Sequence, residues 1–553
     1  MRPAGTWVSG SSRERRCSSR RARPASSSRA LASLTREACI WPDRPAASCA
    51  PLFAGVRAGP GRHRGGIRDG TAPGGRHHRR DRGGGRHGHR RARLLRGHRH
   101  PHPPRRQRPC QGADLAAPER LERPLPGTRR QRLRGRGHGV GLGTAVKNGY
   151  AATTTDAGLG DAIDVSWALN ATGEVNTALL ENLASRSQHE AALVGKQVVA
   201  AAYGQRASYS YFNGCSTGGR QGYMEAQRYP DDFDGILANA PAVNWDEFEV
   251  ATLWPQVVMN NEKTYPSACE FKAFTDAAVK ACDPLDGATD GLVNDAARCD
   301  FDPRRLIGTK VVCDGRELTI TAADAAVVRK IWDGPRTASG RKLWSGVPVG
   351  ADLSALAGVV ADTDSGGVKG APFPVPRYWV ASWLKKQPSF DVSTITYGQF
   401  TKLFEQSRAE YDRIIGTDDP DLSAFRDSGG KLLTWHGQAD QYIPTQGTVD
   451  YRRQVERTMG GSKRVDDFYR LFLVPGAGHC GLNKGVGTID DLAALTAWVE
   501  QGKAPKALPA TLVNAAGQSV NRDVCAYPEV SRYTGHGDPA AASSFRCVLP
   551  TRY

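Results

Sequence analysis

The run Gly214-Cys215-Ser216-Thr217-Gly218 restricts the fold of this chain more than any other feature. It fits the pattern Gly-x-Ser-x-Gly, in which glycines leave room for a sharp turn between a strand and a helix. Residues 208–212, just before it, alternate small and aromatic side chains as a strand does. A helix is expected over 220–228 and a second strand over 233–241. This spacing indicates a βαβ unit, and hence an α/β fold with Ser216 above the sheet.

A serine hydroxyl is a poor nucleophile until a base accepts its proton, so the chain must also supply a histidine and a carboxylate. Beyond residue 142 the histidines are His189, His436, His479 and His536. His479 follows the apolar run 469–474 and sits in a Gly-rich turn, where the base at the end of a last strand belongs. Asp440 lies one predicted strand earlier, in the loop that follows residues 432–435.

The order Ser216, Asp440, His479 is the chain order of α/β-hydrolases. We therefore predict Ser216 as nucleophile, Asp440 as acid and His479 as base. The backbone N–H of Thr217 is the expected oxyanion donor, because it follows the nucleophile directly.

Each assignment has a plainer alternative. Ser216 could be a helix N-cap and Asp440 a turn-forming residue. The strand–turn–helix context of Ser216, and the position of Asp440 one strand ahead of His479, favour catalysis. His436 is expected to pack against or support the site, and His189 and His536 to be solvated.

Further elements are expected along the chain. We expect strands at residues 149–154, 431–435 and 469–474, an interrupted helix at 177–202, and a helix at 489–501.

These residues resemble the tannase/feruloyl esterase family of α/β-hydrolases from about Leu142 to Tyr553. The segments that carry the resemblance are Asn148-Gly-Tyr-Ala-Ala-Thr-Thr-Thr-Asp156, Asn213-Gly-Cys-Ser-Thr-Gly-Gly-Arg-Gln-Gly222, Ala238-Asn-Ala-Pro241, Arg377-Tyr-Trp, His436-Gly-Gln-Ala-Asp440 and His479-Cys-Gly481. The resemblance implies the triad named above, a disulfide between Cys215 and Cys480, and an inserted lid domain with a calcium site.

The implied activity is that of a secreted serine carboxylic-ester hydrolase acting on small esters of phenolic acids. Two alternatives stay open: an esterase resembling the hydrolases of mono(2-hydroxyethyl) terephthalate, and a catalytically impaired binding protein with the same fold. No organic cofactor is expected, and the oligomeric state is not predicted.

Ser216 and Asp440 are 224 positions apart, far more than one βα unit needs, so an insertion is required. We expect a catalytic domain at 143–245 and 425–553, with the lid at 246–424. Asp283, Asp286 and Asp290 alternate with glycines inside the lid, and such acidic loops supply the oxygen ligands that Ca²⁺ requires.

With the family resemblance we expect a structural calcium site rather than a plain Asp/Gly turn. Its ligands would be Asp283, Asp286 and Asp290 through side chains, and Ala288 and Leu292 through carbonyl groups.

Eight cysteines lie beyond residue 200, an even number that fits an oxidised, exported protein. The alternative is a set of reduced, buried thiols. The expected pairs are Cys215–Cys480, Cys282–Cys299, Cys269–Cys313 and Cys525–Cys547.

Residues 1–142 differ from the rest of the chain. They hold 34 of the 75 basic residues, all arginine, and 8 of the 56 acidic residues, so the remainder carries a net charge of −7. They show no periodicity and no export signal. No run of 18 apolar residues occurs in the chain, and no membrane span is expected.

An arginine-rich arm could bind nucleic acid, but such arms mix lysine with arginine and interleave aromatic residues. We expect instead that residues 1–142 are disordered or translated from the wrong reading frame of GC-rich DNA, and we expect no nucleic-acid partner. The second oxyanion donor would then be missing, because it comes from an early loop inside this segment.

Overall fold

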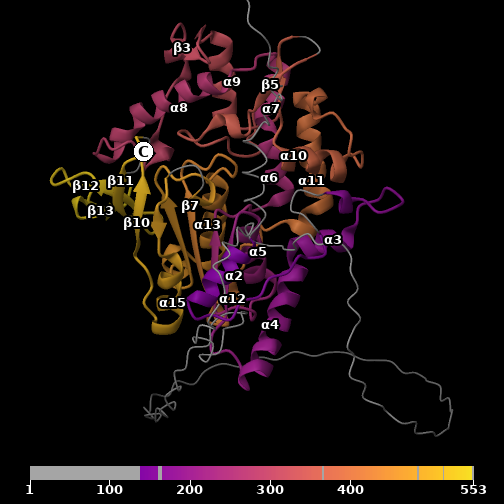
Figure 1. Ribbon diagram of the computed structural model, residues 1–553, viewed down its shortest axis with the longest axis vertical. Coiled ribbons are helices and arrows are strands. Elements are labelled where there is room, and N and C mark those ends of the chain that lie inside the picture. The colour runs from indigo at the N-terminus through magenta and orange to yellow at the C-terminus, as the bar shows by residue number, and fades with distance from the viewer. Residues whose placement is uncertain (1–137, 160–164, 364–365, 482–484, 515, 551–553) are drawn as a thin grey trace, which may run out of the picture. The chain divides into compact units, whose positions relative to one another are not determined.

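The computed structural model describes residues 138–550 except 160–164, 364–365, 482–484 and 515 (Figure 1). The expectations for residues 1–137 lie outside the described residues. Helix α2 (His138–Lys147) begins inside the segment that we expected to be irregular, so the end of that segment is helical instead. It is a short helix of 10 residues, and a segment of this length carries little periodic signal in the sequence.

A four-stranded parallel sheet carries the elements expected around the site. Its strands, in spatial order, are β1 (Tyr211–Cys215), β2 (Gly235–Asn239), β7 (Lys431–Gly437) and β8 (Tyr469–Val474). Helix α5 (Thr217–Arg228) connects β1 to β2, and α13 (Gln446–Met459) follows β7. The sheet confirms the α/β-hydrolase type of fold.

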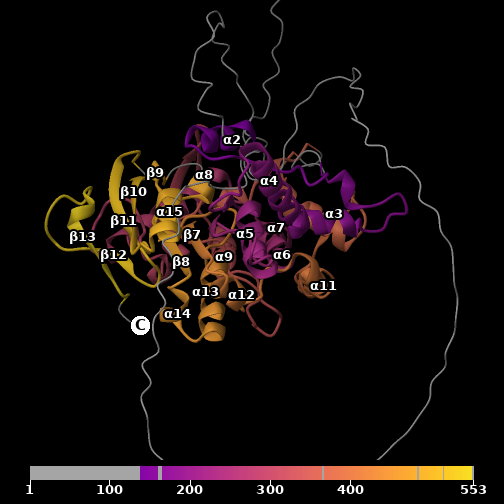
Figure 2. The same cartoon turned by 90° about the horizontal axis from the view of Figure 1, so that it is seen from below.

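Both faces of this sheet are buried because consecutive residues alternate between two cores. Ile236, Leu432 and Leu471 point into one core with residues of α5 and α13. Their neighbours Leu237, Leu433 and Phe472 point into the other, with α15 (Asp491–Gln501), β10 (Ala507–Val513) and β11 (Ser519–Cys525). Seen from below, α15 lies beside the C-terminal strands and α5 lies on the opposite side of the sheet (Figure 2).

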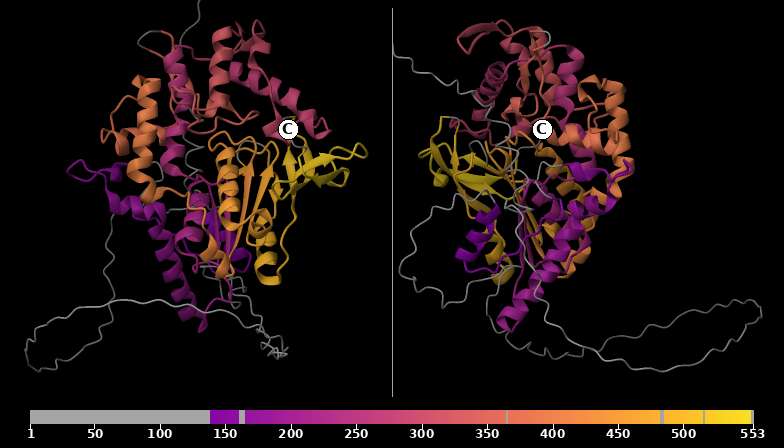
Figure 3. Two further views of the ribbon diagram at one scale, coloured as in Figure 1. Left: turned by 180° about the vertical axis from the view of Figure 1, so that it is seen from behind. Right: turned by 45° about the vertical axis from the view of Figure 1, so that its right-hand side comes forward.

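Between β2 and β7 the chain forms a largely helical segment, whose core also includes Leu180, Met224 of α5, and Tyr442 and Ile443 after β7. The long elements are α6 (Trp245–Thr252), α7 (Trp254–Glu262), α8 (Ala268–Cys282), α9 (Ala322–Asp333) and α11 (Tyr397–Ile415). Two small hairpins complete it: β3 (Lys310–Cys313) with β4 (Arg316–Thr319), and β5 (Val359–Ala361) with β6 (Val368–Gly370). Figures 1 and 3 show these helices gathered beyond the carboxyl ends of the parallel strands. The limits 246–424 for a separate lid domain stay a prediction.

The remaining elements correct some sequence expectations. The interrupted helix is present as α3 (Thr177–Glu181), a π-helical turn (Asn182–Arg186) and α4 (Ser187–Tyr203). The strand expected at 149–154 is wrong: these residues are irregular. Their threonines favour strands, but a strand needs a paired neighbour, and the described sheet offers none there. The strand expected at 208–212 begins later, at Tyr211, because its pairing with β2 starts at Gly235.

Near the C-terminus, β9 (Thr488–Ile489) pairs with β10, and β12 (Val530–Tyr533) pairs with β13 (Phe545–Val548). Among the described residues, no helix is both long enough and apolar enough to cross a membrane.

Candidate active site

Ser216 occupies the sharp turn between β1 and α5. Its backbone angles, φ 66° and ψ −120°, lie in a region that residues with a side chain seldom adopt. The turn is possible because two flanking glycines permit close approach of the backbone. A Cβ on Gly214 would lie 2.6 Å from the carbonyl carbon of Gly218, and one on Gly219 would lie 2.3 Å from the carbonyl oxygen of Asn239. Any side chain at either position would push the turn apart.

Asp440 and His479 meet in the loops that follow β7 and β8. His479 Nδ1 lies 2.7 Å from Asp440 Oδ2, and both side chains are fully buried. A carboxylate only accepts, so Nδ1 carries the proton and Nε2 is left as the acceptor. Nε2 is buried and has no hydrogen-bond partner among the described residues. This is the tautomer that a general base requires.

Four N–H groups hold the Asp440 carboxylate. The backbone N–H groups of Tyr442 and Ile443 donate to Oδ1 at 2.9 and 2.8 Å, and His479 and His436 donate to Oδ2. Burial acts to raise the pKa of Asp440, but the electrostatic attraction of His479 and the hydrogen bonds from both histidines outweigh it. The pKa therefore lies well below its ordinary value, and Asp440 is a carboxylate.

His436 contacts this carboxylate, in agreement with the predicted supporting role of His436. Its Nε2 lies 3.2 Å from Asp440 Oδ2 and 3.1 Å from the carbonyl oxygen of Ile443. Both are acceptors, so Nε2 carries the proton, and Nδ1 accepts from the hydroxyl of Thr448 at 2.9 Å. Thr448 thus fixes the tautomer of His436, and His436 in turn orients Asp440.

Ser216, Thr217 and His479 line one pocket together with residues of the inserted segment. Thr217 is the first residue of α5, where backbone N–H groups lack an acceptor within the helix. Ser216, His479 and the predicted oxyanion donor Thr217 therefore share one cavity at the carboxyl end of the sheet.

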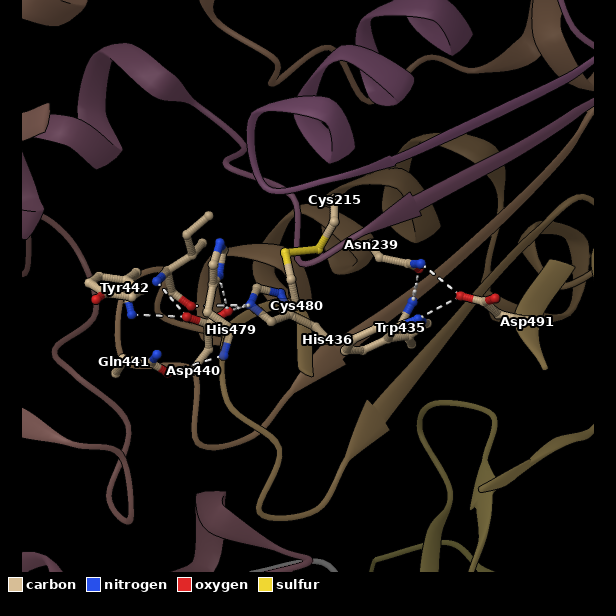
Figure 4. Close-up of a disulfide and its surroundings, with 11 residues drawn as sticks. Cys215, Asn239, Trp435, His436, Asp440, Gln441, Tyr442, His479, Cys480 and Asp491 are labelled. Carbon is tan, nitrogen blue, oxygen red and sulfur yellow. Dashed lines mark hydrogen bonds and ion pairs between the residues drawn. A yellow bond between two sulfur atoms is a disulfide. The ribbon is translucent and has the colours of Figure 1, made fainter. Parts of the chain in front are cut away.

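A disulfide joins Cys215 and Cys480, the chain neighbours of Ser216 and His479 (Figure 4). It links residues separated by 265 positions and so ties the β1–α5 turn to the loop after β8. The other three expected pairs are also confirmed: Cys269–Cys313, Cys282–Cys299 and Cys525–Cys547.

Several residues that support the site were not assigned from sequence. The side chain of Asn239 donates to Asp491 Oδ2 at 2.8 Å, and Trp435 Nε1 donates to the same oxygen at 2.7 Å. The carbonyl of Asn239 also accepts from the N–H of Ser216 at 3.0 Å. Gln441 Oε1 accepts from the N–H of His479 at 3.1 Å (Figure 4). Two of these roles had a signal in the sequence. Gln441 lies beside Asp440, and Asn239 lies in the Ala-Asn-Ala-Pro segment.

The aspartates of the predicted calcium loop mostly bond the loop itself. Asp283 accepts from the N–H groups of Asp290 and Gly291, Asp286 from that of Ala288, and Asp290 from that of Leu292. Asp290 also pairs with Arg522 of β11. Burial, followed by nearby like charges, raises the pKa of Asp286 to about 6. Within the described residues no group of three acidic, histidine or cysteine side chains is arranged to hold a metal, so the calcium site stays a prediction.

Comparison with known proteins identifies the family. A family model described as tannase and feruloyl esterase matches residues 128–548. This chain belongs to that family. The match starts somewhat earlier than the Leu142 expected from the resemblance.

Individual relatives support the same family assignment. The chain is 49% identical over 415 residues to a probable feruloyl esterase of Arthroderma benhamiae, which covers 74% of this chain and 76% of the relative. It is 32% identical over 432 residues to feruloyl esterase B of Aspergillus niger, covering 74% and 78%. Among solved structures, a tannin acyl hydrolase from Aspergillus niger matches with a TM-score of 0.68 and 28% identity over 74% of this chain and 77% of that one. The chain is therefore a carboxylic ester hydrolase of the feruloyl esterase and tannase type, acting on small ester substrates.

Proposed function

We propose that this enzyme hydrolyses esters of aromatic acids by a serine mechanism, with Ser216 as nucleophile, His479 as base and Asp440 as acid. The observation that carries the proposal is the unpaired Nε2 of His479, buried in the same pocket as the strained Ser216 while Asp440 holds Nδ1. The Cys215–Cys480 disulfide supports it, because it ties the nucleophile to the base.

In this mechanism His479 Nε2 accepts the proton of the Ser216 hydroxyl as the serine oxygen attacks the ester carbonyl carbon. Asp440 holds the imidazole in place and stabilises its positive charge. The N–H of Thr217 donates to the negatively charged oxygen of the tetrahedral intermediate. His479 then gives its proton to the departing alcohol, and a water molecule, deprotonated by the same nitrogen, releases the acyl group from Ser216.

The pocket walls support an aromatic acyl group. Phe373 stacks against Tyr442 with ring centroids 4.7 Å apart, and Trp245 and Phe248 also line the pocket. Aromatic side chains favour offset or edge contacts with a planar ring. The names of the relatives, feruloyl esterase and tannase, point to the same class of substrate.

Hydrolysis of methyl ferulate and methyl gallate tests the proposal, with Ser216→Ala as the matched inactive control. We expect turnover by the wild type and a loss of about 10⁴-fold or more in the variant. A fluorophosphonate probe should label the wild type at Ser216. An unlabelled, inactive wild type would favour the binding-protein alternative.

We also propose that the protein is exported and that its acidic loop binds Ca²⁺. Four disulfides support export, because such bonds persist in oxidising compartments. Three carboxylates within one short loop support the cation, whose role would be to hold that loop against β11.

A further inference from the structure

One face of helix α6 forms a wall of the active-site pocket. Trp245, Phe248, Glu249 and Thr252 all line the pocket, and their positions are i, i+3, i+4 and i+7. This spacing places the four side chains on a single stripe of the helix. The stripe is aromatic at its beginning and polar at its end.

The remaining lining residues, apart from Ser216, Thr217 and His479, are apolar or aromatic. They comprise Ala242, Phe373, Val375, Tyr442 and Ile443. Thr252 donates its hydroxyl proton to the backbone carbonyl of Glu249 at 3.1 Å, so this hydroxyl is already engaged. Glu249 is therefore the one acidic side chain in the lining of this pocket.

The Glu249 side chain lacks a partner. The residue is only 3% exposed, and the described residues provide no hydrogen bond or ion pair to its carboxyl group. Burial raises its pKa well above the ordinary value, with the charge of Arg220 opposing that shift less strongly. The guanidinium of Arg220 instead donates to the carbonyl groups of Ala184 and Leu183 at 2.9 and 2.7 Å.

A buried carboxyl group without a partner is costly unless a ligand supplies one. The neighbouring glutamate on the same helix shows the contrast, because Glu247 pairs with Arg408 at 3.4 Å. The structure thus leaves one unpartnered acidic group in a pocket whose other walls, apart from Thr252 and the residues Ser216, Thr217 and His479, are apolar or aromatic. Ligand sites commonly use a few such polar groups to fix the orientation of the ligand.

We propose that Glu249 determines specificity by binding a ring hydroxyl of the aromatic acyl group. This inference rests on the proposed function. A phenolic hydroxyl both donates and accepts, and a carboxyl group that keeps its proton does the same, so the two groups satisfy each other. A carboxylate substituent in that position would set a second acidic group against Glu249, which disfavours terephthaloyl monoesters.

The test compares kcat/KM for methyl caffeate and methyl cinnamate, which differ only in two ring hydroxyl groups. We expect the wild type to prefer methyl caffeate by about 10- to 100-fold, because the unsubstituted ring leaves a buried carboxyl group unpaired. In Glu249→Leu the preference should fall to about one, with cinnamate turnover kept or raised. Glu249→Gln, which still donates and accepts, should keep an intermediate preference.

Glu247→Leu is the matched control, since it makes the same change on the same helix outside the pocket lining. It should keep the wild-type preference. Equal losses on both esters in the Glu249 variants, or a wild type that shows no preference, would overturn the inference while the esterase function stands. A wild type that hydrolyses neither methyl ester would instead refute the proposed function.

Discussion

At the residue scale, the orientation of Asp440 is determined by four N–H donors rather than by His479 alone. Two come from the backbone of its own loop and one from His436, so the carboxylate is already positioned before it contacts the base. Because three donors remain when one is removed, the loss of the donor His436 should lower activity much less than the loss of the Asp440 carboxylate.

Asp440→Asn should reduce kcat by about 10⁴-fold, because the amide favours the wrong tautomer of His479. It should also alter the pH dependence of stability. The folded-state pKa of Asp440 is depressed, so its contribution is present above the ordinary carboxyl pKa and is lost as pH falls. The denaturant midpoints of the wild type and of Asp440→Asn should therefore differ at about pH 7 and converge in acid. Ser216→Ala, which is equally inactive, should keep the wild-type dependence of stability on pH. If Asp440→Asn showed the wild-type dependence as well, this account would be contradicted.

His436→Phe should lower kcat by about tenfold with little change in KM, because Asp440 loses one donor but not its charge. His436→Gln keeps an N–H and should retain most of the activity. If His436→Phe and His436→Gln lower kcat equally, the hydrogen bond from His436 to Asp440 does not contribute and His436 acts only through packing. Stopped assays at saturating and limiting substrate separate kcat from KM.

The double variant Cys215→Ala with Cys480→Ala should lose both stability and turnover. Opening a link across 265 positions removes a constraint worth up to about 5 kcal/mol in the unfolded chain. The loop carrying His479 would also move relative to Ser216, which should lower kcat. The control is Cys525→Ala with Cys547→Ala, which opens a link of only 22 positions that includes no neighbour of a triad residue. Full turnover in the first variant would show that the clamp has no catalytic role.

At the element scale, the loop between α8 and β3 is held by its own backbone N–H groups and by Arg522. Burial raises the pKa of Asp286 and Asp290, and the negative charges of neighbouring aspartates add to the rise, so a bound cation would stabilise their charged forms. Ligand binding to the folded state alone raises the melting temperature.

Adding Ca²⁺ after chelation should raise the melting temperature by about 5 °C or more. In Asp286→Asn this response should shrink or vanish, since a carboxylate ligand is lost. Asp276→Asn, which removes an exposed carboxylate on α8, is the control and should respond as the wild type does. A melting temperature that is the same with calcium and with chelator would exclude the site.

Element limits were predicted best where local chemistry and tertiary context agree. The strand β8 begins and ends where its apolar run does, because both of its faces are buried. The run at 149–154 has strand-forming threonines but no described neighbour to pair with, and β1 begins later than its alternating pattern. Pairing across the sheet, which is not local, sets these limits.

At the scale of the whole molecule, the described part of the sheet ends at β1, the strand that carries the nucleophile turn. Helix α4 also exposes apolar side chains, with Leu193, Val194 and Val198 at 42%, 59% and 41% exposure. An exposed apolar face of this kind marks a surface that another segment normally covers. The hypothesis that residues 1–142 come from a wrong reading frame stays a prediction, and the family match from residue 128 argues against it for the last part of that segment.

We predict that a frame-corrected chain hydrolyses methyl ferulate at least about 100-fold faster than the chain as written, because it restores the second oxyanion donor. It should also unfold at a higher temperature. Sequencing the coding DNA around codons 136–145 provides the direct check, and an uninterrupted frame there would end the hypothesis. Equal activity of the two proteins would contradict the prediction independently. DNA binding that is lost with the leader would instead support a basic arm.

The sequence by itself predicted the chemistry that is proposed for this protein. A serine in a Gly-x-Ser-x-Gly turn, a later aspartate and a histidine after the last strand of the parallel sheet are local signals, and each sits at the end of a recognisable strand. All four cysteine pairs could also be proposed, Cys215–Cys480 from the family resemblance and the other three from cysteines that lie close together in the sequence. Only the tertiary structure decided that Thr448, Gln441 and Asp491 support the site, and that Glu249 lines the pocket without a partner. These roles depend on contacts between residues far apart in the chain, and distance in space has no counterpart in the order of residues.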